Sequence, residues 1–147
     1  MRNTFKLSFL ALTLVGSLSM TSCKKYENYD NKEVVENTFT GDVDVTSGGA
    51  DPAGDFTGSG DTGTYSFAWT NSQKKCSANF DITTNTGSVQ MIINDAKGKE
   101  VLNETRTAGG NDTYSGVSEE GKPGNWLVTL ILTDFNGDGS YSIHPGN

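Results

Sequence analysis

From residue 65 onward, apolar side chains recur at every second position, and this period constrains the fold more than any other feature of the chain. A period of two places alternate side chains on opposite faces of an extended strand. No stretch beyond the first 22 residues carries the period of an amphipathic helix. The clearest segments contain Tyr65, Phe67 and Trp69; Cys76, Ala78, Phe80 and Ile82; and Val89, Met91 and Ile93.

Clusters of glycine, asparagine and aspartate separate these segments at intervals of about 8 to 12 residues, as in all-β domains. We expect a glycine-rich loop and then turns at residues 47–63, 85–87, 95–98 and 136–139. Further strands are predicted at 38–45, 100–107, 112–117, 126–132 and 141–143. The sequence therefore predicts an all-β fold, a single small antiparallel β-sandwich, with a partly open barrel as the alternative.

The last two predicted strands contain the most apolar run of the chain. Residues 126–132 are apolar on both faces, which is typical of a strand that is central in its sheet. The layout from Gly124-Asn125-Trp126 to Gly139-Ser140-Tyr141-Ser142-Ile143 resembles the ending of jelly-roll and pre-peptidase C-terminal sandwich domains. The resemblance covers about twenty residues and implies a jelly-roll-like sandwich, but no particular activity.

The first 22 residues have the layout of an export signal. Arg2 and Lys6 precede an apolar run at 7–18, about a dozen residues long, whereas a membrane-spanning helix needs about 20. The following Leu-Ser-Met-Thr-Ser-Cys at 18–23 resembles a bacterial lipobox, with Met20 where the family usually has Leu. The resemblance implies cleavage before Cys23 and a diacylglyceryl thioether on the Cys23 sulfur. An incidental cysteine at the end of an ordinary secretory signal is the alternative.

This layout divides the chain into a signal peptide at 1–22, a lipidated tether at 23–37 and a β-sandwich domain at 38–147. Lysines followed by acids at 24–30 loosely resemble the surface-export signals of Bacteroidota lipoproteins. We therefore expect lipid anchoring at the outer membrane or cell surface.

The charge balance argues against nucleic acid as a partner. Loss of the signal removes two of the 11 basic residues and none of the 18 acidic ones, which leaves a formal charge of about −9. Binding to phosphates requires clustered basic side chains, and the sequence has no such cluster. The lipid should therefore be the membrane contact, with a glycan or an envelope protein as a further partner.

The most motif-like string contains Asp134, Asn136, Asp138 and Ser140. It resembles the calcium loop of EF-hands and dockerins, with oxygen ligands at the first, third and fifth positions, Gly139 at the sixth and a backbone ligand at the seventh. The resemblance breaks at the twelfth position, which is Pro145 rather than an acid. The favoured interpretation is a plain hairpin turn, and weak Ca²⁺ binding is the alternative.

Tyr65, Phe67 and Trp69 form an aromatic stripe with two interpretations. Exposed rings stack on sugars, which would make Tyr65 and Trp69 ligand-binding residues. At a period of two, however, large side chains more often fill the core of a small domain, and we favour that reading. Cys76, on the apolar face of its strand, is likewise expected to be a buried hydrophobe.

The sequence offers little for catalysis. His144 is the single histidine and lies next to Pro145 near the terminus, and adjacent acids such as Glu119 and Glu120 are usually solvated surface. We therefore expect no catalytic residues and a non-enzymatic binding or accessory module on a lipid anchor. The alternatives are a carbohydrate-binding lipoprotein of a glycan-uptake system and a carboxylate-dependent hydrolase.

Overall fold

The computed structural model describes residues 37–44, 51–109 and 112–146 of the chain. Its strands are β1 (Asp42–Val43), β2 (Ala53–Asn71), β3 (Lys75–Asn94), β4 (Glu100–Thr107), β5 (Thr113–Val117) and β6 (Gly124–Gly146). All strand pairs are antiparallel, which confirms the predicted all-β class. Within these residues no helix is long and apolar enough to cross a membrane. The predicted signal peptide, Cys23 and most of the tether lie outside the described residues.

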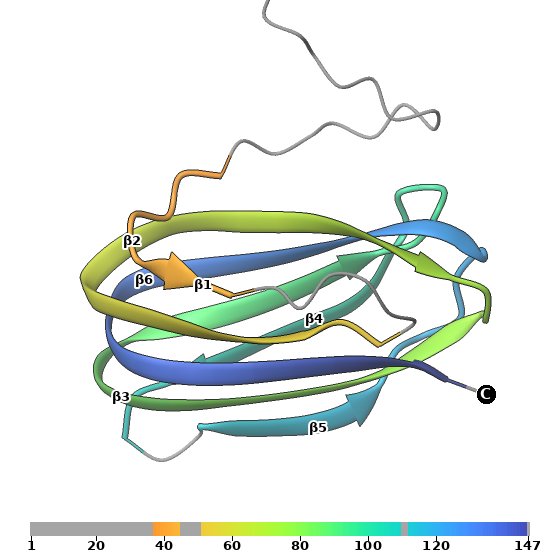
Figure 1. Ribbon diagram of the computed structural model, residues 1–147. Coiled ribbons are helices and arrows are strands. Elements are labelled where there is room, and N and C mark those ends of the chain that lie inside the picture. Colours follow the sequence, from red (N-terminus) through yellow and green to blue (C-terminus); the bar gives the residue numbers. More distant parts are fainter. Residues whose placement is uncertain (1–36, 45–50, 110–111, 147) are drawn as a thin grey trace, which may run out of the picture.

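Three long strands, β2, β3 and β6, bend in the middle and build the body of the molecule (Figure 1). Their pairing registers shift at 59–63 in β2 and at 84–88 in β3, opposite the same part of β6. Such irregularities increase the local bend of a strand, and glycines favour them. Gly60 and Gly87 have φ values of 92° and 89° at these bends, and Asp134 has a φ of 46°.

The bends fold one hydrogen-bonded sheet into two layers. Layer A contains β1, the first half of β2, the second half of β6, the first half of β3, and β5, in that order. Layer B contains the second half of β2, the first half of β6, the second half of β3, and β4. The predicted β-sandwich is confirmed, and β6 is central in both layers, as its apolar run indicates.

The core lies between the layers and consists of the inward-facing alternate residues. Cys76, Trp126 and Leu130 are fully buried, which confirms the predicted burial of Cys76. Aromatic pairs contribute to this core. Phe67 of layer B lies 5.7 Å from Tyr141 of layer A, and Phe56 lies 5.4 Å from Phe135, measured between ring centroids.

The predicted loop at 47–63 is wrong from residue 53 onward, because β2 begins at Ala53. The glycines of this stretch do not break the strand but make room for neighbours. A Cβ atom on Gly63 would lie 2.5 Å from the Cα of Phe39, and one on Gly58 would lie 3.3 Å from the Phe39 ring. The predicted strand at 38–45 shortens to β1, and Phe39 precedes it.

The predicted turns at 85–87 and 136–139 are also wrong. Both stretches lie inside continuous strands, β3 and β6, at or beside the bends. A glycine with positive φ serves a bend as well as a hairpin turn, so the residue types did not distinguish the two. The turn at 95–98 and the strands at 100–107 and 112–117 are confirmed.

Candidate binding groove at the open edge of the sandwich

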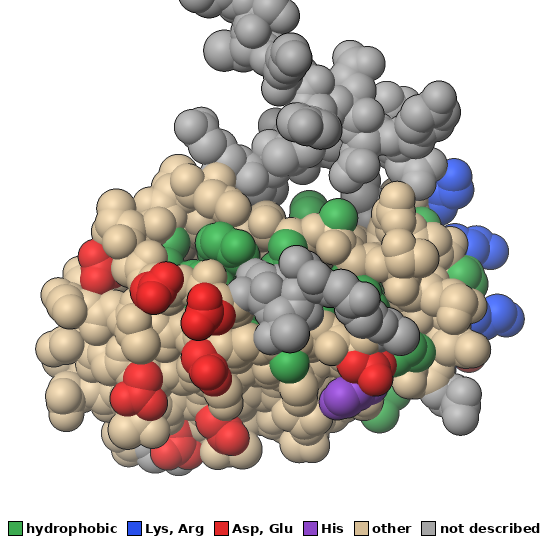
Figure 2. Space-filling view, viewed as in Figure 1, with side chains coloured by type: hydrophobic (Ala, Val, Ile, Leu, Met, Phe, Trp, Pro, Cys, Tyr) green, Lys and Arg blue, Asp and Glu red, His purple; other side chains and the backbone are tan. Residues whose placement is uncertain are grey.

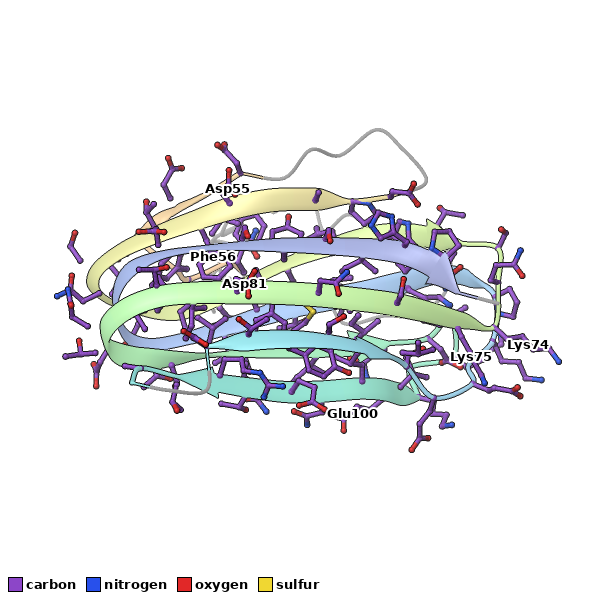
Figure 3. All side chains as sticks on the ribbon, turned by 90° about the horizontal axis from the view of Figure 1, so that it is seen from below. Asp55, Phe56, Lys74, Lys75, Asp81 and Glu100 are labelled. Atoms are coloured by element: carbon purple, nitrogen blue, oxygen red, sulfur yellow. The ribbon has the colours of Figure 1, made fainter. Side chains whose placement is uncertain are left out.

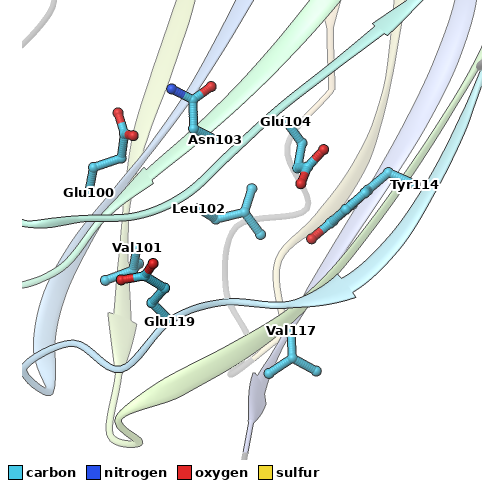
Figure 4. Close-up of a pocket in the computed structure, with 8 residues that line it drawn as sticks. All are labelled: Glu100, Val101, Leu102, Asn103, Glu104, Tyr114, Val117 and Glu119. Carbon is cyan, nitrogen blue, oxygen red and sulfur yellow. The ribbon is translucent and has the colours of Figure 1, made fainter.

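β4 and β5 are the edge strands of layers B and A on the same side of the sandwich. β4 pairs with the second half of β3 and β5 with its first half. In the described part of the chain, no strand pairing joins β4 to β5. A pocket of about 320 Å³ lies between them, here called the groove (Figure 4). That volume is at the lower end of the range for small-ligand sites.

The apolar lining of the groove comes from both strands. Leu102 of β4 is 6% exposed and points toward the middle of the groove, as does Tyr114 of β5 (Figure 4). Val117, at the end of β5, is 61% exposed and is the single exposed large hydrophobic side chain among the described residues. The groove therefore presents a ring and two branched aliphatic side chains within one hollow.

Neighbours on two sides fix the position of the Tyr114 ring. Its centroid lies 5.6 Å from that of Phe80, and the guanidinium carbon of Arg106 lies 4.9 Å from it. Gly116 leaves the space that the ring occupies, because a Cβ atom there would lie 2.6 Å from Cζ of Tyr114. Burial, and then the charge of Glu104, raise the pKa of Tyr114. The phenol therefore stays neutral and can donate a hydrogen bond.

Arg106 closes one end of the groove by bridging the layers. From β4, its Nε donates to the carbonyl oxygen of Thr113 at 2.9 Å, and an Nη donates to that of Thr105 at 2.6 Å. The same guanidinium lies 3.5 Å from the Glu104 carboxylate, and the Arg106 side chain is only 13% exposed. Arg106 thus connects the two layers, with its Nε and one Nη bound to backbone carbonyls.

Residues 118–119 close the other end. The Ser118 amide donates to the Cys76 carbonyl in layer A, and the Glu119 amide donates to the Val101 carbonyl in layer B, each at 2.8 Å. This crossing places the Glu119 carboxylate in the groove lining, 3.2 Å from Lys99 Nζ.

Polar groups surround this apolar centre. Glu100, Asn103, Glu104 and Glu119 complete the lining, and Figure 4 shows Glu100 and Asn103 pointing away from Leu102, on the rim. The Asn103 amide oxygen accepts a hydrogen bond from Gln90 at 2.7 Å. Carboxylate and amide oxygens accept hydrogen bonds from hydroxyl groups. The groove therefore combines an aromatic and aliphatic surface with several acceptors for a ligand rich in hydroxyls.

The predicted aromatic stripe lies elsewhere. Trp69 is 5% exposed and packs edge-on against Trp126 with centroids 5.9 Å apart, which confirms the core interpretation and leaves Trp69 no free face for a sugar. Tyr65 is partly buried on β2, at the opposite edge of layer B. The structure brings neither residue to the groove.

The predicted calcium ligands lie along β6 and do not converge. Asp134, Asn136, Asp138 and Ser140 fall at alternate positions of one extended strand, where neighbours of that kind are about 6.6 Å apart. Asp134 is at the bend, and its amide donates to Thr62 Oγ1 at 2.8 Å. Among the described residues, no three His, Cys, Asp or Glu side chains are grouped to hold a metal ion. Ca²⁺ binding stays a prediction without a formed loop.

A second hollow, of about 310 Å³, lies on the outer face of layer A. Asp55, Asp81 and Asp138 surround it with serine and threonine side chains, and Asp55 of β2 and Asp81 of β3, labelled in Figure 3, lie on either side of β6. Phe56 contributes to the lining but is only 1% exposed. This hollow offers carboxylate and hydroxyl groups but no aromatic ring with an open face.

The remaining candidate residues are scattered. Burial raises the pKa of the Cys76 thiol, which disfavours the reactive thiolate. His144 Nδ1 lies 3.4 Å from an Asp51 carboxylate oxygen, and both side chains are about half exposed. Glu120 is in an ion pair with Lys75 at 3.9 Å, outside the groove, whereas its neighbour Glu119 lines the groove.

Comparisons with known proteins return β-sandwich modules of low similarity. No family model and no curated protein matches the chain. The structure of TmCBM61 in complex with β-1,4-galactotriose matches with a TM-score of 0.48 and 14% identity, over 75% of this chain and 88% of that one. A carbohydrate binding module from Cellvibrio mixtus lichenase 5A, in complex with cellotriose, matches with a TM-score of 0.41 and 12% identity, over 76% and 91%. At these levels the ligands named for those modules say nothing about the ligand of this chain.

Sequence reasoning missed Leu102, Glu104, Tyr114 and Val117 as site residues. The predicted strands at 100–107 and 112–117 contain these residues, but nothing in the sequence showed that the two strands face each other. Glu119 carried a signal, as an acid in a loop, but was attributed to solvated surface.

Proposed function

We propose that this protein is a non-catalytic binding module that takes a carbohydrate in the groove between β4 and β5. The observation that carries the proposal is the fixed Tyr114 ring beside Leu102 and Val117, ringed by oxygen acceptors. Sugars present C–H surfaces that pack on rings and aliphatic side chains, and hydroxyls that donate to carboxylates and amides. A partly open groove of this size suits a few sugar units better than a large apolar ligand.

The carboxylates of the groove fit binding better than hydrolysis. Glu104 and Glu119 each lie beside a cation, Arg106 and Lys99 respectively. Glycoside hydrolysis uses a pair of carboxyl groups, one of which must hold a proton for the leaving oxygen. Two carboxylates held next to cations are instead suited to accept hydrogen bonds from hydroxyls. Turnover of an oligosaccharide that is lost in Glu104→Gln or Glu119→Gln would revive the hydrolase alternative.

Attachment to a membrane through Cys23 is part of the same proposal. Its support is the export-signal layout and the lipobox-like residues 18–23. Several acyl chains would make attachment effectively permanent, because each buried methylene contributes about 0.8 kcal/mol. Radiolabelled palmitate should enter the wild-type product and not the Cys23→Ala variant. An unmodified N-terminus released into the medium would remove the anchor but not the groove.

The groove is tested by glycan-array screening followed by calorimetric titration with the best ligand. Tyr114→Ala should weaken binding at least tenfold, and Gly116→Ala, which displaces the ring, should do the same with Tyr114 intact. A single anchoring contact of this kind is worth about 1 to 3 kcal/mol.

Tyr65→Ala is the matched control, because it removes a partly buried tyrosine at the opposite edge of layer B. Circular dichroism would establish folding of each variant. Loss of binding in Tyr65→Ala with full binding in Tyr114→Ala would place the ligand on the aromatic stripe and refute the groove.

A further inference from the structure

The charged groups that line the groove have an uneven balance. Glu100, Glu104 and Glu119 contribute three carboxylates, whereas Lys99 and Arg106 are the cations beside them. Glu104 pairs with Arg106 and Glu119 pairs with Lys99, at 3.5 and 3.2 Å. Glu100 makes no ion pair in the described part of the chain. One negative charge is therefore left on the rim.

Both cations already have partners within the protein. The Arg106 guanidinium donates to two backbone carbonyls and lies over the Tyr114 ring. Lys99 Nζ donates to the Glu120 carbonyl at 3.0 Å in addition to its ion pair. A carboxylate or sulfate entering the groove would meet acceptors and negative charge, with no unused cation to offset the lost hydration.

The wider surface carries both signs of charge. Lys74 and Lys75 lie at the end of the sandwich opposite the bends, where Figure 3 labels them, while Figure 2 shows acidic side chains gathered toward the bent end. The chain as a whole has a formal charge of −7. Net negative charge raises the local concentration of cationic ligands and lowers that of anionic ones.

We propose that the groove selects glycans by charge, binding amine-bearing sugars most tightly, uncharged sugars less tightly and acidic sugars least. This inference rests on the proposed carbohydrate-binding function and names the ligand class of the same site. Two unit charges about 4 Å apart in water interact by about 1 kcal/mol, which is about a fivefold change in affinity. The carboxylate of Glu100 is the group that supplies this preference, because the other two already face cations.

The test uses three tetrasaccharides with the same β-1,4-linked backbone, built from glucose, glucosamine or glucuronate. Titrations of the mature chain in mildly acidic buffer, where the sugar amines are protonated, should give a glucosamine tetramer bound about fivefold tighter than the glucose tetramer. The glucuronate tetramer should bind at least fivefold more weakly than the glucose tetramer. The differences should shrink in about 1 M salt, where the screening length is about 3 Å.

Glu100→Gln should abolish most of the charge preference, measured as the ratios of the affinities for the three tetramers within the same variant. Glu120→Gln is the matched control, since it removes an exposed carboxylate of the adjacent loop that does not line the groove. Equal affinities or a reversed order would overturn the charge selection and leave carbohydrate binding in place. Failure of all three tetramers to bind would overturn this inference, while the glycan array decides the proposed function separately.

Discussion

At the β2 edge of the sandwich, residues 37–44 cross from layer B to layer A, whereas the β4–β5 edge is bridged by the Arg106 side chain and residues 118–119. The amides of Thr38 and Phe39 donate to the Thr64 carbonyl in layer B, and the Asp44 amide donates to the Asp55 carbonyl in layer A. At the other edge the bridges stand at the two ends, and the space between them is the groove.

The difference shows how one sandwich closes one edge and keeps the other available. At the closed edge, Phe39 packs against the core beside Gly41, Gly58 and Gly63, where side chains would collide with it. At the open edge, Gly116 provides similar room, but the ring that fills part of it belongs to β5 itself and faces the groove. Glycines therefore leave room for the Phe39 ring at the closed edge and for the Tyr114 ring of the groove at the open edge.

The largest effect is expected at the loops that frame the open edge. Asp95 is 1% exposed, and its carboxylate accepts hydrogen bonds from the amides of Lys97, Lys99 and Lys122 at 2.7 to 2.8 Å. Asp95→Ala would leave these buried donors without that acceptor and should lower the free energy of unfolding by about 3 to 5 kcal/mol. Unfolding in urea measures this change in free energy. Asp95→Asn, which keeps one oxygen, should lose less, and equal losses would refute the role given to the carboxylate.

The stability of the closed edge should depend on the Phe39 side chain, which packs there against the core. Phe39→Ala should lower the free energy of unfolding by about 2 to 3 kcal/mol, less than for a fully buried phenylalanine, because the ring is only partly buried. Glycan affinity should stay unchanged, since the groove lies at the other edge. Phe39→Leu serves as the control with a smaller loss. Unaltered stability in Phe39→Ala would show that the β2 edge does not depend on the Phe39 ring.

The Arg106 bridge of the open edge should contribute less. Arg106→Gln removes the guanidinium from above Tyr114 and from the two carbonyls that it bridges, at a cost of about 1 to 2 kcal/mol in unfolding free energy. Arg106→Lys retains the charge but not the planar guanidinium, so its free energy of unfolding should lie between those of the wild type and Arg106→Gln. Glycan binding should weaken along with stability, because the Tyr114 ring loses support. Unchanged binding in a destabilised Arg106→Gln protein would separate the Arg106 bridge from the site.

The smallest effect concerns alkaline pH at the closed edge. Burial first, then the nearby Tyr65, Asp44 and Asp55, raise the pKa of Tyr141 above its ordinary value of 10.0. The folded protein therefore retains a proton that the unfolded chain releases, so stability is full below about pH 10 and falls as the pH rises above it. Between about pH 9 and 11, the free energy of unfolding of Tyr141→Phe should fall by about 1 kcal/mol less than that of the wild type. Cys76, with its own raised pKa, is common to both proteins and cancels in the comparison. Parallel curves would contradict the assignment to Tyr141.

The alternation of apolar residues predicted the all-β sandwich, the central place of β6 and the burial of Trp69, because strand periodicity is a local property. It could not distinguish a bend from a turn at 85–87, since glycine with positive φ serves both. The loop predicted over 53–63 failed for a related reason, because those glycines give space to Phe39 rather than end a strand.

The groove was beyond prediction because it depends on the bend of β3. β4 pairs with one half of β3 and β5 with the other half, so Glu104 and Tyr114 face each other only after the two halves fold into separate layers. The sequence shows both strands but not this relation. Aromatic residues at 65–69 instead drew attention to a stripe whose Trp69 lies in the core.

Amide chemical-shift mapping tests the groove most directly. Titration of the ¹⁵N-labelled mature chain with the best neutral oligosaccharide from the array should shift resonances of residues 100–104 and 114–119 and spare those of 64–70 and 138–142. Shifts confined to the outer face of layer A, or to the edge that carries Tyr65, would contradict the account.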